Sequence, residues 1–298
     1  MFYNSVERCR VGYVPTLSMQ GLKNEWGKFP PILIILIYSK EMIFISKIEL
    51  NVGDVFITNE GCEATVIKIV NRKEIYITFK ECEFPIRTRL GELRSGSIKN
   101  PCLPTVCGVG YIGQGNYKGR NGGGKSKSYI TWINMLRRCY DEKSKTKNPT
   151  YKECYVCEEW YNYQNFAKWY EENYYEVDGE KMTLEKDLLI RGNKIYSPET
   201  CIIAPNKINC LIIGCNSARG DYPKGVNFHK ASGKYVAQCS VDDCKRKHLG
   251  LFNTPEEAFL SYKEFKEQYI KQVAEEYRDK IPTKLYEAMM KWEVEITD

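Results

Sequence analysis

Three consecutive residues, Glu185, Lys186 and Asp187, have the clearest capacity for chemistry in this sequence. They lie in the apolar run MTLEKDLLI, residues 182–190, which predicts a β-strand. Two carboxylates this close together can hold a divalent cation, which lowers the pKa of a bound water molecule. An exposed lysine cannot act as a general base at neutral pH, because its pKa lies near ~10.4.

The segment after this run predicts the elements that position these residues. A turn is expected at residues 191–194, and YSPETCIIAPNKIN, residues 196–209, is typical of a second strand that enters a helix. With the upstream segments WINMLRRCY and VCEEW, this order resembles the HNH or His-Me-finger nucleases of phages over residues 125–215. The resemblance implies Mg²⁺ if the protein is a nuclease, and it places catalytic roles at Glu185, Lys186, Asp187 and Asn209, with Asn206 also on the helix.

This sequence departs from the HNH pattern at one decisive position. Lys186 stands where the family has its histidine base. Two interpretations follow from the resemblance. Either the chain is a metal-dependent endonuclease with an atypical active site, or the finger is degenerate and serves only as a scaffold or a DNA-binding element.

The cysteines allow a structural metal site. Cys154 and Cys157 have the spacing of a zinc knuckle, and Cys139 and Cys201 flank them, so four thiolates could bind Zn²⁺. The alternative is that these cysteines are buried free thiols. The chain has 13 cysteines, an odd number, and the sequence shows no secretory signal, which favours the reducing cytoplasm of a bacterial host cell.

Residues 224–265 read as a complete small module. Three strands are predicted at 225–230, 234–241 and 245–252, and they are separated by Ser232-Gly233 and Asp242-Asp243. A helix follows, because Thr254 suits the N-cap, Pro255 the first helical position and Glu257 the third residue of a capping box. An apolar stripe then predicts that this helix lies on the sheet; it consists of Ala258, Tyr262, Phe265 and Tyr269.

The strands of this module carry mainly positive charge. Seven basic residues fall between Arg219 and Lys247, against three acidic residues, Asp221, Asp242 and Asp243. A sheet face with such a charge favours nucleic acid. In GVNFH, Gly233-Lys234-Tyr235, HLGLF and TPEEA, the module resembles the ethylene-response-factor (apetala-type) DNA-binding domain, which places its sheet in the major groove. The resemblance directs toward DNA the side chains of Lys224, Asn227, His229, Gln238, Ser240, Arg246 and His248.

Strand periodicity supports part of this assignment independently. Alternation along the third strand places Arg246 and His248 on one face and leaves Leu249 for the helix side. The alternative interpretation is an ordinary solvated sheet face. The base preference of the plant family does not transfer, because Asn227, His229 and His248 stand where plant members have arginines and a tryptophan.

The remainder of the 298-residue chain predicts an α+β multidomain protein with a modest net charge of +6. The apolar run at 31–38 is too short to span a membrane, and no membrane association is expected. Met42 stands just before a regular domain start, so the residues before it are expected to precede the natural start or to form a poorly ordered arm. The predicted divisions are an N-terminal extension (1–46), a small β-barrel-like domain (47–107), a Gly-rich linker (108–127), an HNH-like α/β region (128–217), an apetala/ethylene-response-factor-type domain (218–274) and a C-terminal helix (275–298).

These observations predict a DNA-binding protein of phage or mobile-element type. Its partner is duplex DNA, which the basic three-stranded sheet would recognise. The second hypothesis is a metal-dependent, homing-like HNH endonuclease. The third is a protein-interaction module that uses no nucleic acid.

Overall fold

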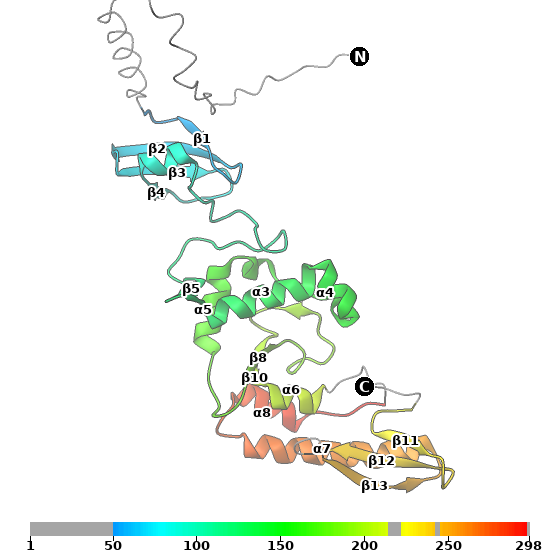
Figure 1. Cartoon of the computed structure of the whole chain (residues 1–298). Helices are drawn as coiled ribbons and strands as arrows, with labels where there is room; N and C mark the ends of the chain where they lie inside the picture. The colour runs from blue at the N-terminus through cyan, green and yellow to red at the C-terminus, as the bar shows by residue number, and fades with distance from the viewer. Residues whose placement is uncertain (1–49, 214–221, 242–244, 297–298) are drawn as a thin grey trace, which may run out of the picture. The chain divides into compact units, whose positions relative to one another are not determined.

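The protein has a mixed α+β structure with several antiparallel sheets, which confirms the expected fold class (Figure 1). The computed structural model describes residues 50–213, 222–241 and 245–296. It divides into two compact units: residues up to Thr78 together with Phe84–Ile98, and Phe79–Glu83 together with Lys99–Asp298. No helix in the described ranges is both long enough and apolar enough to cross a membrane. The predicted extension at 1–46 lies outside the described residues.

The first unit is an open sheet. Strands β1 (Val55–Ile57), β2 (Glu63–Asn71), β3 (Glu74–Phe79) and β4 (Ile86–Thr88) lie in the order β1-β2-β3-β4, and helix α2 (Leu90–Ser95) follows. Alternate residues of β3 are buried, as period-two alternation requires. The expected β-barrel is wrong for the described residues, since β1 and β4 are opposite edges of the sheet and do not pair.

The predicted Gly-rich linker, residues 108–127, packs against the helices that follow it. A side chain at Gly110 would collide with Trp132 and Leu136, so glycine permits close packing on the following helix. Gln164 donates hydrogen bonds from Nε2 to the backbone oxygens of Ile112 (3.1 Å) and Tyr117 (3.0 Å). The segment ends in a two-stranded hairpin, β5 (Arg120–Asn121) and β6 (Gly124–Lys125).

An aromatic core holds the next elements together. They are α3 (Lys127–Tyr140), α4 (Glu142–Lys147), η3 (Pro149–Tyr151), β7 (Tyr155–Val156), η4 (Glu158–Tyr161) and α5 (Tyr163–Asn173). Trp132, Trp160 and Phe166 are fully buried, and Trp132 Nε1 donates to the backbone oxygen of Trp160 at 2.7 Å. These aromatic residues, which come from α3, η4 and α5, are therefore core residues.

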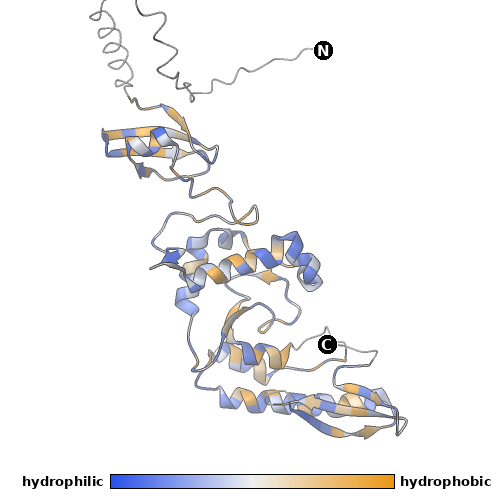
Figure 2. Cartoon of the chain, in the orientation of Figure 1, coloured by the Kyte–Doolittle hydropathy of each residue, from blue (hydrophilic) through white to orange (hydrophobic). Residues whose placement is uncertain are grey.

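The predicted strand-strand-helix order is confirmed. Strand β8 (Met182–Glu185) pairs antiparallel with β10 (Ile202–Pro205), and α6 (Asn206–Ile212) begins directly after β10. The first strand is shorter than predicted, because the chain leaves the ladder after Glu185. Between them β9 (Ile195–Tyr196) pairs parallel with β7. Apolar residues concentrate along α6 and along α8 (Thr283–Met290), which share one buried cluster (Figure 2).

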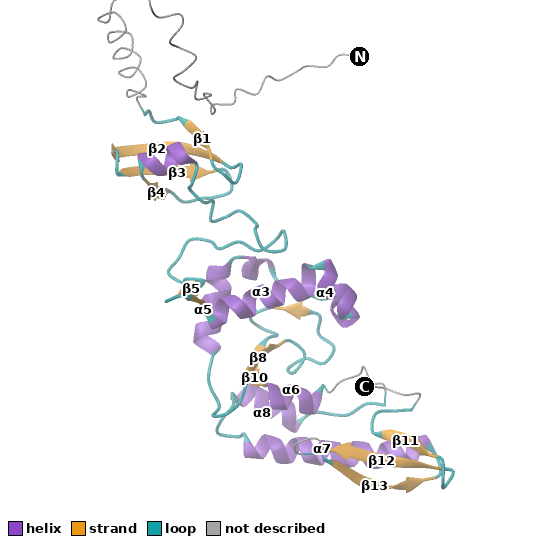
Figure 3. Ribbon diagram, viewed as in Figure 1, coloured by secondary structure: helices purple, strands orange, loops and turns teal. Residues whose placement is uncertain are grey.

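The last module consists of three strands that lie along one long helix (Figure 3). The strands are β11 (Val226–His229), β12 (Lys234–Ser240) and β13 (Arg246–Phe252), in the order β11-β12-β13, and the helix is α7 (Pro255–Glu276). The predicted capping box is present, since Thr254 Oγ1 accepts from Glu257 N and the Glu257 carboxylate accepts from the N-cap amide. Val226, Ala237 and Cys239 are buried with α7 residues in one core.

Candidate nucleic-acid interface and a second polar cluster

The strand register separates the C-terminal sheet into two faces. Val226 pairs with Ala237, and both are buried with residues of α7, so this side of the sheet faces the helix. Side chains alternate along a strand, and residues paired across strands share a face. Four cross-strand sets therefore lie on the opposite side, which we call the open face: His229 with Lys234; Asn227 with Val236 and Leu251; Gln238 with His248; and Ser240 with Arg246.

This geometry brings together six of the seven residues predicted to contact DNA. They lie on the open face, and each is exposed apart from the half-buried Gln238; they are Asn227, His229, Gln238, Ser240, Arg246 and His248. The register shifts at a bulge between Ala237 and Gln238. Leu249 is the extra residue of β13 at this bulge, and Gln238 therefore pairs with His248. His229 Nδ1 lies 2.8 Å from Ser232 Oγ in the first turn.

Two basic residues of the module point elsewhere. Lys224, the seventh predicted DNA contact, donates from Nζ to the backbone oxygen of Ile213 at 3.1 Å, at the end of α6. Lys247 pairs with the buried Cys239, and its ammonium group lies 4.6 Å from the ring centroid of Phe265 on α7. The Lys224 side chain is therefore directed to the end of α6 and does not belong to the open face. The Lys247 side chain faces α7.

The open face has an unbalanced charge. On the open face Lys234 and Arg246 are exposed, and residues 222–241 and 245–253 contain no aspartate or glutamate. Arg219, Asp221, Asp242 and Asp243, which the sequence analysis also counted, lie outside the described residues. Positive charge attracts polyanions, and the attraction is strongest at low ionic strength.

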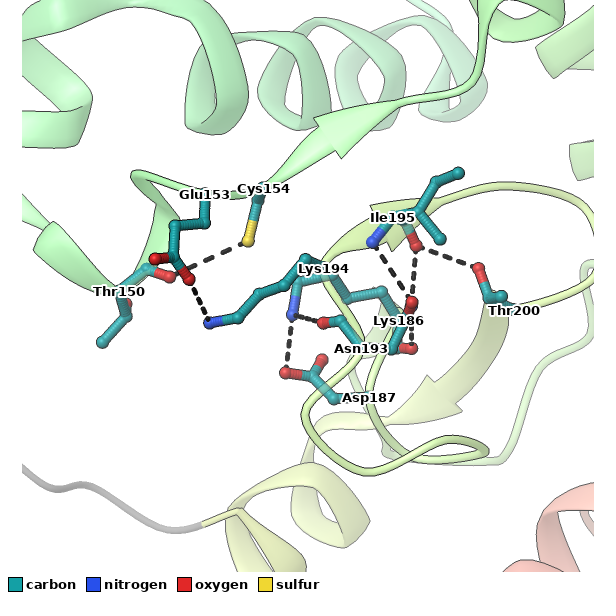
Figure 4. Close-up of polar contacts among 9 residues, drawn as sticks. All are labelled: Thr150, Glu153, Cys154, Lys186, Asp187, Asn193, Lys194, Ile195 and Thr200. Atoms are coloured by element: carbon teal, nitrogen blue, oxygen red, sulfur yellow. Dashed lines mark hydrogen bonds and ion pairs between the residues drawn. The ribbon is translucent and has the colours of Figure 1, made fainter.

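A second cluster surrounds Lys186 in the loop after β8 (Figure 4). The Lys186 side chain is buried, and its Nζ lies 2.7 Å from Asp187 Oδ2 and 2.8 Å from the backbone oxygen of Asn193. Asn193 in turn donates from Nδ2 to the backbone oxygens of Lys186 (2.8 Å) and Ile195 (2.7 Å). A buried ammonium group needs such partners. Lys186 therefore ties the two ends of the loop together.

Glu185 is the group of this cluster best suited to proton transfer. Burial raises its pKa to about 7, opposed by a hydrogen bond from Thr183 and by the charge of Arg138. The guanidinium group of Arg138 also lies 5.7 Å from the ring centroid of Tyr151. A carboxyl group with a pKa near neutrality can both accept and release a proton at pH 7. Sequence analysis selected Glu185 but missed Arg138 and Tyr151, because only the fold brings them close.

Asn206, the first residue of α6, lies away from these carboxylates. Glu185, the last residue of β8, pairs with Ile202. The backbone N–H of Asn206 instead donates to the backbone oxygen of Lys181, the residue just before β8. Four residues of strand separate the two ends by about 13 Å. Asn209, one turn into α6, has a buried Oδ1 atom without a hydrogen-bond partner. The structure therefore brings Glu185, Lys186 and Asp187 together, but not Asn206.

The four cysteines predicted to hold zinc do not form a metal site in the described part of the chain. The described residues contain no group of three or more His, Cys, Asp or Glu side chains arranged to hold a metal ion. Cys139, Cys154 and Cys201 are buried, and burial raises the pKa of each thiol, which keeps it protonated. The Mg²⁺ expected for a nuclease at Glu185 and Asp187 stays a prediction. Elsewhere Cys82 and Cys102 form a disulfide, which the cysteine spacing did not predict.

Comparisons with known proteins add no family assignment. The chain matches no family model, no curated protein and no solved structure.

Proposed function

We propose that this protein binds duplex DNA through the open face of β11–β13. The observation that carries the proposal is the register, which gathers hydrogen-bonding and basic side chains on the side of the sheet opposite α7. Lys234 and Arg246 can contact phosphates, which supply most of the affinity of a DNA-binding protein. Asn227, Gln238 and His248 can form hydrogen bonds with base edges.

The dimensions of the sheet support a major-groove contact. Strand β12 has seven residues, which corresponds to about 20 Å of extended chain. The major groove is about 12 Å wide and admits strands as well as helices. The centre of β12 can therefore reach the bases while its ends lie near the two phosphate backbones.

Two adjacent residues of β13 provide a matched test. Arg246 lies on the open face and Lys247 faces α7, so the same charge reversal can be made on either side of the sheet. We expect Arg246→Glu to weaken binding of the full chain to a random-sequence duplex by about tenfold or more, and Lys247→Glu to change it little. Fluorescence anisotropy measures both. Equal losses, or no binding by the unsubstituted protein to DNA or RNA, would refute the proposal, and the second result would favour a protein-interaction module.

Phosphodiester hydrolysis is a second candidate function, and one observation favours it. Glu185 is buried at the end of β8 with a pKa raised to about 7, as a general base requires. If the protein is a nuclease, Glu185→Gln should abolish nicking of supercoiled plasmid while DNA binding persists. Incubation with Mg²⁺, Mn²⁺ or EDTA tests the activity directly. Intact plasmid under all three conditions would leave DNA binding as the function.

A further inference from the structure

The centre of the open face is apolar. Val236 and Leu251 are directly opposite each other in the β12–β13 register, and both point away from α7. Leu251 keeps 43% of its surface exposed, and Val236 is half-buried. A single exposed leucine is ordinary on a protein surface. An apolar pair in the middle of a basic face is more specific, because burying it against a partner provides a hydrophobic contribution that phosphate contacts lack.

The residues around this apolar pair define what it can recognise. Asn227, on the neighbouring strand β11, pairs with Val236. Gln238 lies two residues after Val236 along β12. Two residues correspond to about 7 Å, close to two base-pair steps. Cations lie toward the two ends of the sheet, with Lys234 at one end of β12 and Arg246 opposite the other end. Amide side chains beside apolar side chains match one kind of base pair in the major groove.

We propose that the open face prefers A·T base pairs and that Val236 and Leu251 contact the 5-methyl group of thymine. In the major groove, thymine presents a methyl group that apolar side chains contact, and adenine presents a donor and an acceptor that Asn or Gln can bind together. Asn227 and Gln238 supply the amides. The charge of the face selects DNA over an apolar partner. This inference rests on the proposed function and adds the class of base pair.

Synthetic duplexes that differ by one methyl group test this inference without any substitution in the protein. The probes are alternating dA-dT, dA-dU and dG-dC duplexes, and the full chain is titrated with each. We expect dA-dT to bind best. Replacement of thymine by uracil should weaken binding about fourfold for each methyl group that the protein buries. Equal affinity for the dT and dU duplexes would overturn the methyl contact while leaving DNA binding intact, whereas no binding to any duplex would overturn both proposals.

Substitutions then assign the preference to the apolar pair. Val236→Ser with Leu251→Ser should bring the dT-to-dU affinity ratio close to one while the salt dependence of binding stays unchanged. Leu260→Ser is the matched control, because Leu260 is an exposed leucine on α7, 62% exposed. Circular dichroism confirms that each variant is folded. A thymine preference that survives the double substitution, or that is lost equally in Leu260→Ser, would overturn the role of Val236 and Leu251.

Discussion

The contacts of Lys186 are structural. Its ammonium group holds Asp187 and the backbone oxygen of Asn193 from a side chain that is only 7% exposed. Lys186→Met should lower the free energy of unfolding by about 1 to 3 kcal/mol, because it removes the donor of two buried interactions. Urea denaturation measures the loss.

The control for this substitution is Lys194→Met. The Lys194 side chain is 45% exposed, and its Nζ lies 3.7 Å from Glu153 Oε2; such a surface pair contributes about 0 to 1 kcal/mol. A loss for Lys186→Met no larger than that for Lys194→Met would contradict the structural role of Lys186.

Glu185 should give the protein a pH-dependent stability. Its pKa is raised by burial from 4.5 to about 7, so between these pH values the folded protein holds a proton that the unfolded chain has released. The free energy of unfolding therefore falls as pH rises through this window. Glu185→Gln should remove about 2 to 3 kcal/mol of the decrease between pH 5 and pH 8. Parallel stability profiles for the two proteins would contradict the raised pKa.

At the scale of elements, Gly225 fixes how β11 meets α7. Its φ is +81°, and an added methyl group would overlap the ring of Tyr262. Gly225→Ala should therefore cost about 2 to 5 kcal/mol of stability, from left-handed backbone strain and overpacking together. Gly233→Ala is the control, since Gly233 has φ +66° with open space around it, and we expect a loss of about 1 kcal/mol. Similar losses in denaturant titrations would show that the Tyr262 contact is unimportant.

The C-terminal module could be predicted from sequence because local signals determine it. The predicted strands at 225–230, 234–241 and 245–252 agree with β11, β12 and β13 to within one or two residues. Gly233 provides the left-handed turn between the first two strands, and Thr254 with Glu257 determines where α7 begins. Alternation then predicts correctly that Arg246 and His248 share the face opposite the helix.

Features that depend on distant contacts could not be predicted. Glycine content suggested a linker at 108–127. In the structure, Gly110 packs so closely against Trp132 that no side chain would fit there. Alternation identified strands in the first unit but not whether its sheet closes. The spacing of Cys154 and Cys157 likewise says nothing about where Cys139 and Cys201 lie in the fold. The contacts of Lys186 require the loop conformation, which no local pattern specifies.

At the scale of the whole molecule, the distribution of charge matters more than its total. A net charge of +6 on 298 residues is modest, and the proposed function depends on a sheet whose described residues carry no carboxylate. Binding to DNA should therefore respond to single open-face cations and not to cations elsewhere. Counterion release makes this dependence measurable, since each phosphate contact adds about 0.9 to the slope of log affinity against log salt concentration.

The most direct test is a salt titration of DNA binding by the full chain. We predict that affinity for a random-sequence duplex falls steeply and linearly on logarithmic axes as NaCl rises. Lys234→Ala and Arg246→Ala should each reduce the slope by about 0.9, and Lys247→Ala should leave it unchanged because Lys247 faces α7. Binding that is independent of salt, or a slope that falls equally for Lys247→Ala, would contradict the assignment of DNA binding to the open face.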